Sequence, residues 1–537
     1  MGMVELGVAL LVTAGLIVLQ ATMMLHAGPL WRDEISTLRV VESPTLWEML
    51  KMNCGDSFPS LFHVLLRGWM ALGLGDSDAM LRVLPFLIGL GLIGAIWWTG
   101  RRLGCRVPLI TLVLFGLSPT VLRFAWGVRA YILGVLLMFV VMGLLWELIQ
   151  KPTRGRILLT ALVAVLAVQA VYVNAFMLLA SCAGAAAVCL RRRQWKTLGI
   201  ILGIGVAAAI SVLPYVPMFQ RSSEWTALVK VPINTPWLLL KFADAAECAL
   251  PYGEAMLWIW LAVGLVGLVT CGYRANPSAT DQPPERKDLA LYALASLVAG
   301  SVCFFVYLQF LSVATQVWYY IPVMGVVAVL ADVGVALFVS GGLAGRLVRL
   351  GFVIALIAMT WSGAWASAHM RWTNCDLVAG RVRSLAEKDD YIVVSPHYVG
   401  AAFARYYTGS APWTTLPELD QYRFQSYVSF KQKMMQPEAI KPILERMAKT
   451  LQSGHRVWLV SMGGMPLLRP GEEPGDLAPA PNSPAGWSEG AYVQIWLRQT
   501  AYVIQSHATR LSQVPVPVAD PVFPHEDLML LCAEGWH

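Results

Sequence analysis

Long apolar runs separated by short polar loops occupy the first 370 residues of the chain. The run from Met3 to Leu25 is almost wholly apolar and long enough to cross ~30 Å of hydrocarbon as a helix. Further runs of about 20 residues follow at 79–99, 107–123, 130–149, 157–174, 176–190, 198–218, 254–272, 289–311, 318–339 and 347–367. The pattern predicts a polytopic α-helical membrane protein with about 11 transmembrane helices.

Two stretches in this part of the chain depart from that pattern. The apolar stretch 60–74 is shorter, and we interpret it as interfacial or re-entrant. The first run has neither a basic n-region nor a clean small-residue cleavage site, so we expect it to stay as a helix. Composition agrees with a chain mostly in lipid, because only 14% of residues are charged against roughly 25% in soluble domains.

Basic residues lie in alternate loops, which predicts the orientation of the chain. These loops hold Arg101, Arg102 and Arg106, then Lys151, Arg154 and Arg156, then Arg191, Arg192, Arg193 and Lys196, then Arg274, Arg286 and Lys287, then Arg346 and Arg349. The positive-inside rule places them in the cytoplasm and the intervening loops outside. The formal net charge of +7 then marks contact with anionic membrane lipids and not with nucleic acid.

After Met370 the composition changes, and no membrane-length run follows. Helical patterns at 377–388, 399–407 and 439–451 alternate with strand patterns at 390–395 and 456–461. The Pro- and Gly-rich stretch 464–487 predicts a loop. We expect residues 1–370 to form a transmembrane catalytic domain and residues 371–537 a soluble, extracytoplasmic α/β domain.

The nine cysteines do not show the spacing of a zinc site. Those at 182, 189, 271 and 303 fall in or beside apolar runs and predict inert packing. Cys54, Cys248, Cys375 and Cys532 fall on the outer side, where a disulfide is permitted, although the pairing is not readable from the sequence.

Polar side chains gather in the loops predicted to face outward. The first such loop begins with Trp31-Arg32-Asp33-Glu34, directly after the first span. Ionisable residues at the edge of hydrocarbon are costly unless paired or wet, and they are therefore candidates for a functional site. The candidates are Asp33, Glu34, Asp56, His63, Arg82, Arg129, Tyr131, Asn174, Gln316, Tyr319 and Tyr320. The competing interpretation is a solvated flank for the acids, snorkelling for the arginines and an interfacial belt for the aromatic residues.

Taken together, these residue types suit a site that binds a lipid phosphate and a hydroxyl. A guanidinium can hold two oxygens of a lipid phosphate that gains negative charge as it leaves. A carboxylate can accept the proton of a hydroxyl that attacks an anomeric carbon.

Several motifs carry a family resemblance over roughly residues 28–135. Trp31-Arg32-Asp33-Glu34 is followed by Phe58-Pro59-Ser60-Leu61-Phe62-His63, by Met80-Leu81-Arg82-Val83-Leu84-Pro85, and by Ser118-Pro119 with Arg129-Ala130-Tyr131. Their order and spacing resemble GT-C membrane glycosyltransferases, in particular the bacterial branch related to protein O-mannosyltransferases (family 39) and the lipid A aminoarabinose transferase. The segment Gln316–Pro322 resembles that family loosely.

The sequence departs from the family pattern at three positions. Phe58 stands where the family often has His, Ser60 where it has a second Pro, and Trp318 roughly where an Arg is common. The first change removes a potential substrate ligand, and the last removes a potential phosphate contact. Arg82 and Arg129 would then carry more of the phosphate binding.

The resemblance implies an inverting glycosyltransferase that moves a sugar from a polyprenyl-phosphate donor to an acceptor hydroxyl. It implies Asp33 as general base, with Glu34 orienting the acceptor or supporting the site. The acceptor would be a glycan, lipid or protein, on the periplasmic side of a bacterial inner membrane. Oxygen ligands from Asp33, Glu34 and Asp56 could hold a divalent ion, although this branch usually works without one.

Two other functions use the same features. A transporter or flippase of lipid-linked sugar would have broken helices, inverted repeats and ionisable residues near the bilayer midplane. A non-catalytic subunit of an envelope polysaccharide assembly system would use the tail as a binding module. The crowding of charge at the outer interface favours the transferase.

Overall fold

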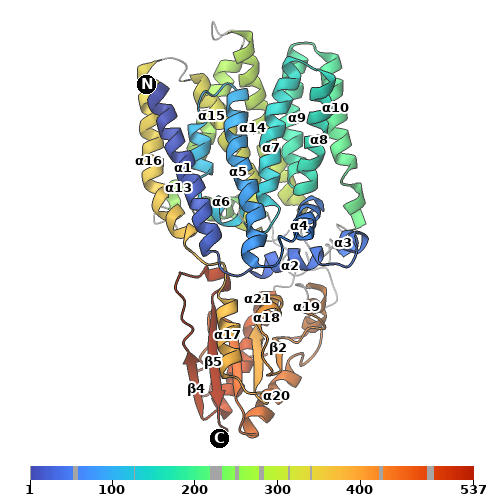
Figure 1. The fold of residues 1–537 in the computed structure, drawn as a ribbon, viewed down its shortest axis with the longest axis vertical. Helices are drawn as coiled ribbons and strands as arrows, with labels where there is room; N and C mark the ends of the chain where they lie inside the picture. The colour runs from blue at the N-terminus through green and yellow to red at the C-terminus, as the bar shows by residue number, and fades with distance from the viewer. Residues whose placement is uncertain are drawn as a thin grey trace. The chain divides into compact units, whose positions relative to one another are not determined.

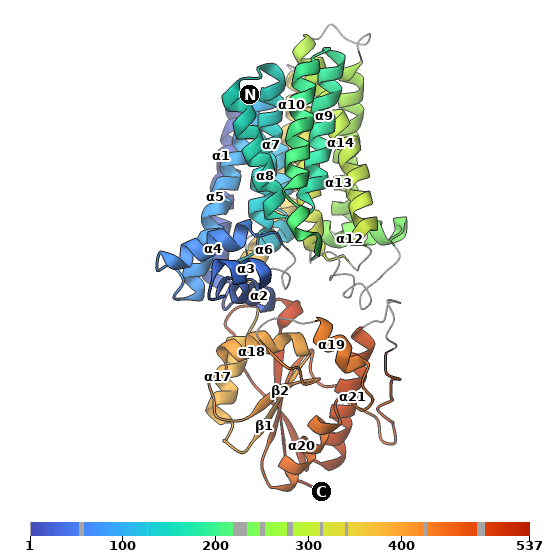
Figure 2. The same ribbon diagram turned by 90° about the vertical axis from the view of Figure 1, so that its right-hand side faces the viewer.

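The computed structural model describes the chain except for residues 1, 53–57, 126, 218–232, 248–252, 277–282, 312–314, 339–341, 423–426 and 481–488. The chain divides into two compact units, each of which is shown in Figures 1 and 2. The helical unit comprises Met1–Leu25, Ser57–Pro217 and Pro232–Ala368. The α/β unit comprises His26–Asp56, Met218–Val231 and His369–His537. The first polar loop therefore belongs to the same unit as the C-terminal tail.

The helical unit is a bundle of long apolar helices with short elements at its ends. In chain order these are α1 (Gly2–His26), α4 (Leu61–Ala71), α5 (Asp78–Arg102), η2 (Thr111–Phe115), α6 (Pro119–Ala125), α7 (Tyr131–Gln150), α8 (Arg154–Ala170), α9 (Asn174–Arg191), α10 (Trp195–Ile210), η3 (Leu213–Tyr215), α12 (Thr235–Glu247), α13 (Gly253–Ala275), α14 (Pro284–Leu311), η4 (Val317–Tyr320), α15 (Ile321–Phe338) and α16 (Leu343–Ala368). Within the described chain, nine helices are long and apolar enough to cross a membrane. The protein is thus a polytopic α-helical membrane protein, as the hydrophobic pattern predicts.

The apolar run at 107–123 does not form the single helix that the sequence predicts. Residues Thr111–Phe115 form a π-helical turn, and α6 begins only at Pro119. Proline has no N–H to donate and disfavours helix at the residue before it, so the chain breaks at Ser118. The run predicted at 157–174 ends early as well, because α8 stops at Ala170 and Val171 is extended.

Short polar residues set the start of other helices in this unit. The Ser77 hydroxyl accepts a hydrogen bond from the Met80 N–H (3.2 Å) at the start of α5, and Thr153 accepts one from Arg156 (3.4 Å) at the start of α8. Each satisfies a backbone donor that the first turn leaves open. The predicted interfacial stretch 60–74 forms α4, which lies with α6 and α12 at the same end of the bundle (Figure 2).

The α/β unit is a five-stranded sheet with helices on both faces. Its elements are α2 (Arg32–Val41), α3 (Leu46–Met52), α17 (Cys375–Leu385), β1 (Tyr391–Ser395), η5 (His397–Val399), α18 (Gly400–Tyr406), β2 (Trp413–Thr415), α19 (Tyr427–Met434), α20 (Lys441–Gln452), β3 (Val457–Met462), α21 (Glu489–His507), β4 (Arg510–Val514), η6 (Pro524–Glu526) and β5 (Leu528–Glu534). The strand order is β2-β1-β3-β5-β4. Strand β1 is parallel to β2 and β3, whereas β5 is antiparallel to both β3 and β4.

The two strands and three helices predicted in the tail are present at nearly the predicted residues. The structure adds β2, β4, β5, α19 and α21, which the sequence pattern did not indicate. Figure 2 shows α17 and α18 on one side of the sheet and α20 and α21 on the other. The buried core on the α20–α21 side includes Val393, Phe430, Met447, Leu459 and Trp496. This unit therefore has a hydrophobic core of its own.

Candidate functional site

Helix α2 carries the two adjacent carboxylates and gives them different environments. Ile35, Leu38 and Val41 are buried along one face of the helix. Glu34 is fully buried, and its carboxylate accepts a hydrogen bond from the Trp31 N–H at 3.2 Å. The side chain of Asp33 keeps 21% of its surface exposed and lies 3.7 Å from the Arg32 guanidinium. Glu34 thus stabilises the start of its own helix, while Asp33 remains accessible to a reactant.

The segment before α2 is fastened to the C-terminal part of the chain. The carbonyl of Ala27 accepts a hydrogen bond from the Trp372 N–H at 2.9 Å. The Leu30 N–H donates to the Tyr406 hydroxyl at 2.8 Å, and the rings of Trp31 and Trp372 stack with their centroids 5.1 Å apart. Residues more than 340 positions apart in sequence therefore fix where α2 begins.

Arg32 lies among side chains of the C-terminal part. Its guanidinium carbon is 4.2 Å from the centre of the Tyr398 ring, a cation–π distance. Its backbone N–H donates to the carboxylate of Glu526 at 3.3 Å. Burial raises the pKa of Glu526 to about 7, with Arg32 acting in the opposite direction. Burial also raises the pKa of Glu489, again opposed by the charge of Arg32.

The contact with Tyr398 places the start of α2 at the carboxyl edge of the parallel strands. Tyr398 belongs to η5, which follows β1 directly, and α2 packs against α18. From β1 the chain passes through α18 to β2 on one side, whereas β3 lies on the other side of β1. In open α/β sheets, ligands bind at the carboxyl edge where the strand order changes direction. Asp33 thus lies on an element beside the edge that such sheets use for binding.

His397 lies beneath this edge and is fully enclosed. Its ring stacks on Phe430, with the centroids 3.9 Å apart, and neither ring nitrogen has a hydrogen-bond partner. Burial, and then the charge of Arg32, lowers the pKa of His397 to about 3. The imidazole is therefore neutral at physiological pH.

The helical unit brings three of the motif residues together. Phe58 lies under Arg129, with the guanidinium carbon 4.5 Å from the ring centre, and meets the Tyr131 ring edge-on at 4.7 Å. Arg129 is 6% exposed and Phe58 is 2% exposed. Phe58 therefore serves as a cation–π partner for the arginine.

Tyr215 holds the start of α4, the helix that carries His63. Its hydroxyl is 3.1 Å from the Ser60 N–H, 3.0 Å from the Ser60 hydroxyl and 2.7 Å from the side-chain oxygen of Gln169. His63 is buried, with its Nδ1 3.3 Å from the carbonyl oxygen of Pro59. Tyr215 was not among the predicted site residues, because a single Tyr near the end of the apolar run 198–218 carries no signal of such contacts.

Two more buried arginines lie on elements of this unit. Arg82, in α5, is 4% exposed. Arg123, in α6, is also 4% exposed and donates to the Ser367 hydroxyl at 3.2 Å. The next residue, Phe124, packs on Trp318 with ring centroids 4.8 Å apart. Arg123 was not among the predicted site residues, although it follows the Ser-Pro motif by four positions.

The remaining predicted site residues range from fully buried to exposed. Asn174 is fully buried and donates to the carbonyls of Gly134 (3.0 Å) and Ala167 (2.8 Å), which joins α7, α8 and α9. Tyr320 is buried, with its hydroxyl 3.3 Å from that of Thr315. Tyr319 is half-buried and Gln316 is exposed. Asp56 lies outside the described residues.

The predicted site is thus divided between the two units. Asp33 and Glu34 belong to the α/β unit, whereas His63, Arg82, Arg129, Tyr131, Asn174, Gln316, Tyr319 and Tyr320 belong to the helical unit. Among the residues that the structure describes, no three His, Cys, Asp or Glu side chains form a group able to hold a metal ion. Cys375 and Cys532, where a disulfide was permitted, are both free and buried.

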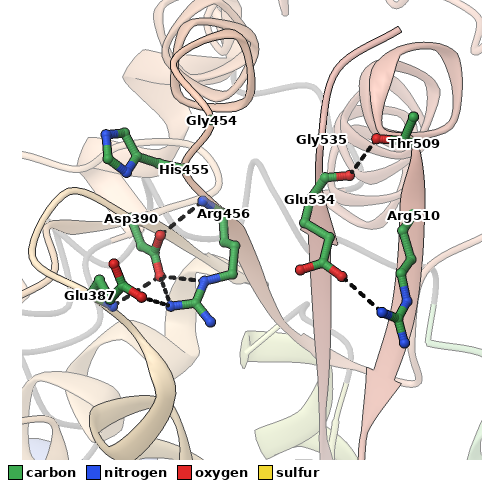
Figure 3. A pocket seen from close by; sticks show the side chains of 9 residues that line it. All are labelled: Glu387, Asp390, Gly454, His455, Arg456, Thr509, Arg510, Glu534 and Gly535. Atoms are coloured by element: carbon green, nitrogen blue, oxygen red, sulfur yellow. Dashed lines mark hydrogen bonds and ion pairs between the residues drawn. The ribbon is translucent and has the colours of Figure 1, made fainter.

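A separate cavity of about 570 Å³ opens at the amino-terminal edge of β1 and β3 (Figure 3). Asp390, in its wall, accepts hydrogen bonds from the backbone and side chain of Arg456 and from the Trp458 indole. Arg510 pairs with Glu534 across β4 and β5 at 3.3 Å. These charged groups are paired with one another, and they lie at the opposite edge of the sheet from Tyr398.

The structure is similar to solved membrane proteins at low sequence identity. One is the Archaeoglobus fulgidus oligosaccharyltransferase in complex with Zn and sulfate, with a TM-score of 0.51, 12% identity, and coverage of 84% of this chain and 67% of that one. A second, AglB from the same organism in complex with an inhibitory peptide and a dolichol-phosphate, has a TM-score of 0.50, 11% identity, and coverage of 84% and 69%. ArnT from Cupriavidus metallidurans bound to undecaprenyl phosphate has a TM-score of 0.47, 14% identity, and coverage of 85% and 93%.

No protein-family model matches the sequence, and no curated protein matches it. The structural similarity confirms the predicted GT-C-type fold. The more specific resemblance to protein O-mannosyltransferases stays a prediction.

Proposed function

We propose that the protein is an inverting glycosyltransferase that moves a sugar from a polyprenyl phosphate to an acceptor hydroxyl. The observation that carries this proposal is the difference between the two adjacent carboxylates of α2. Glu34 is buried and accepts a hydrogen bond from the start of its own helix, whereas Asp33 is partly exposed beside Arg32. A general base must reach the proton that it removes, and only Asp33 of this pair is exposed enough to do so.

In the proposed reaction, Asp33 acts as the general base and the lipid phosphate is the leaving group. The acceptor hydroxyl loses its proton to Asp33 as its oxygen forms a bond to the anomeric carbon. The bond from that carbon to the lipid phosphate breaks, and the electron pair leaves with the phosphate. Attack opposite to the leaving group inverts the configuration at the anomeric carbon. Removal of a proton by a positioned base supplies a factor of roughly 10²–10⁴ in rate.

Buried arginines are the groups that we assign to the phosphate. Arg82, Arg123 and Arg129 are each 6% exposed or less. A guanidinium can bind two phosphate oxygens at once, and a site shielded from water strengthens that interaction. The Phe58 ring lies against one face of the Arg129 guanidinium, with the guanidinium carbon 4.5 Å from the ring centre.

The proposal also includes a polyprenyl-phosphate donor and a location in the membrane. AglB, which shares the fold, was solved in complex with a dolichol-phosphate. This chain has apolar helices that can contact both a polyprenyl lipid and the membrane lipids. We place Asp33 and the tail on the periplasmic side of a bacterial inner membrane, because the positive-inside rule assigns the basic loops to the cytoplasm. A divalent ion held by Asp33, Glu34 and Asp56 stays a prediction, because Asp56 lies outside the described residues.

The buried charges of the helical unit do not favour a transporter. Asp332 is 1% exposed and accepts hydrogen bonds from the backbone and hydroxyl of Thr111 (3.2 Å each) and from Arg349 (2.9 Å). These bonds hold the π-helical turn η2 against α15 and α16. Side chains so fully engaged with one another serve the packing of the bundle, whereas an ion-coupled transporter needs groups that can bind a substrate or coupling ion.

The central test is transfer of radiolabelled sugar from undecaprenyl phosphate to endogenous acceptors in membranes that contain the protein. Asp33→Asn should lower turnover by about 10²–10⁴ while the protein remains folded in the membrane. Asp389→Asn is the matched control, because Asp389 is an exposed acid in the same unit. Wild-type turnover in folded Asp33→Asn would refute the assignment of the base. Movement of labelled lipid between leaflets without transfer would favour a flippase, and loss of transfer in folded Asp33→Asn would exclude a non-catalytic subunit.

The phosphate assignment has its own test. A bound ligand adds stability to the native state, so undecaprenyl phosphate, the lipid phosphate that remains when the sugar has left the donor, should raise the melting temperature of the wild type. Arg129→Ala and Arg82→Ala should reduce that increase, and Arg129→Lys should restore little of it, because lysine lacks the bidentate fork. Arg154→Ala, at an exposed position at the start of α8, is the control. If undecaprenyl phosphate raises the melting temperature of both alanine variants as much as that of the wild type, these arginines are only membrane anchors.

A further inference from the structure

Helix α2 begins against a buried carboxylate that comes from near the end of the chain. Glu526 is fully buried in η6, and its Oε2 lies 3.3 Å from the backbone nitrogen of Arg32, the first residue of α2. The first turn of a helix leaves backbone N–H groups without intrahelical partners and carries a partial positive charge. A carboxylate at that position satisfies both needs. Here it comes from a segment 494 residues away in sequence.

The same turn is held on its other side by the Arg32 side chain. The guanidinium carbon lies 4.2 Å from the centre of the Tyr398 ring and 5.5 Å from that of the Trp31 ring. The Tyr398 ring thus contacts the guanidinium, while Glu526 accepts from the backbone of the same residue. Asp33 is the next residue along the helix, so its position depends on both contacts.

We propose that Glu526 is a positioning residue for the reaction: its ionised carboxylate holds the first turn of α2 and thereby sets where the Asp33 carboxylate lies. This proposal rests on the function proposed above, in which Asp33 is the general base. Glu526 does not touch the reacting atoms. It acts through the backbone of Arg32, and its protonation weakens that hold.

The surroundings of Glu526 make its ionisation sensitive to pH near neutrality. Burial raises its pKa to about 7, against the lowering effects of Arg32 and of a hydrogen bond with the Thr373 hydroxyl. The ionisable groups facing it are Arg32 and Asp33 of α2, Cys375 of α17 and Tyr398 of η5. An ionised carboxylate accepts a shorter and stronger hydrogen bond than a neutral carboxyl does. The hold on α2 therefore strengthens as the pH rises through about 7.

Stability and activity should then change with pH in opposite directions. A carboxyl whose pKa is raised in the folded state stabilises the protein fully below its unfolded pKa. That contribution is lost as the pH rises from the ordinary value of 4.5 to about 7. Over the upper part of the same range, ionisation improves the positioning of Asp33, so turnover should rise. A purely structural carboxyl would lower stability with rising pH without the gain in turnover.

The test compares the full-length wild type with Glu526→Gln and Glu526→Ala in detergent, by sugar transfer from undecaprenyl phosphate and by melting temperature between pH 5 and 8. Glutamine keeps an acceptor oxygen for the Arg32 N–H but does not titrate. The wild type should gain turnover through pH 7 and lose melting temperature, and Glu526→Gln should flatten both profiles. Glu526→Ala removes the cap and should lower kcat by about tenfold with little change in KM. Glu534→Gln, at a half-exposed position in β5, should behave as the wild type.

The outcomes separate this proposal from the function on which it rests. If Glu526→Gln keeps the wild-type rise in turnover through pH 7, Glu526 does not position the base, even when Asp33→Asn abolishes transfer. If Asp33→Asn transfers sugar at the wild-type rate, the proposed base is wrong. In that case the melting profiles of Glu526→Gln still report whether Glu526 titrates in the folded protein. Glu526→Gln remains informative if Glu526→Ala does not fold.

Discussion

Asp390→Asn is expected to lower the free energy of unfolding of the α/β unit by about 2–4 kcal/mol. The Asp390 side chain is 1% exposed. One of its oxygens accepts from the Arg456 N–H at 2.8 Å, and the other accepts from the Arg456 side chain (3.1 Å), the Trp458 indole (2.9 Å) and the Glu387 N–H (2.9 Å). Figure 3 shows how the carboxylate and Arg456 close the wall of the cavity.

The magnitude follows from what asparagine can replace. Its oxygen can still face the side with three donors, but its NH₂ group must then face the Arg456 N–H, so one buried donor loses its acceptor. Removing one partner of a buried ion pair costs about 3–5 kcal/mol. The guanidinium side chain of Arg456 is 26% exposed, and water screens part of the loss. We therefore expect a value somewhat below that range.

Pulse proteolysis of the full chain in detergent over a urea series measures the effect, because the protease cleaves only molecules in which the α/β unit is unfolded. With a urea dependence of roughly 2 kcal/mol per molar, the midpoint should fall by about 1–2 M. Glu387→Gln is the matched control, because Glu387 pairs with the same arginine but its side chain is 74% exposed, and exposed pairs contribute at most about 1 kcal/mol. An unchanged midpoint in Asp390→Asn would refute the structural role. A loss of sugar transfer at full stability would instead make the cavity of Figure 3 a binding site.

Three further predictions concern other parts of the molecule. Tyr215→Phe removes the hydroxyl that ties the start of α4 to α8 and should lower the melting temperature and the rate of sugar transfer. Tyr273→Phe, at an exposed position in α13, should change neither. Equal behaviour of the two variants in both assays would contradict this prediction. The pKa of His397 is lowered to about 3 in the folded protein, so the unfolded chain binds more protons below about pH 6.5, and stability should fall as the pH drops toward 3. His397→Phe should flatten that acid limb in melting curves, and an unchanged slope would show that another group causes it. A membrane-impermeant thiol reagent applied to intact cells should label Ala478→Cys, which lies at an exposed position of the chain; labelling only after the inner membrane is opened would place the tail in the cytoplasm.

The sequence by itself determined the class of protein and most of its long helices. Apolar runs such as Met3–Leu25 must become membrane helices, because a backbone in hydrocarbon has to satisfy its hydrogen bonds within its own segment. The tail strands at 391–395 and 457–462 were also predictable, since a run of β-branched residues between turn signals is a local pattern. The motif order through residue 135 predicted the GT-C-type fold, which the structural similarity confirms.

Only the tertiary structure decided how the candidate site is built. Asp33 and Glu34 are adjacent acids in the sequence, yet one is partly exposed and the other is fully buried. Their helix begins at Arg32, which contacts Tyr398 and Glu526, more than 360 residues further along the chain. Periodicity records which face of an element is apolar, but it carries no information on which distant element covers that face. Strands β4 and β5 escaped prediction for the same reason, because their pairing with β3 is a long-range choice made when the core packs.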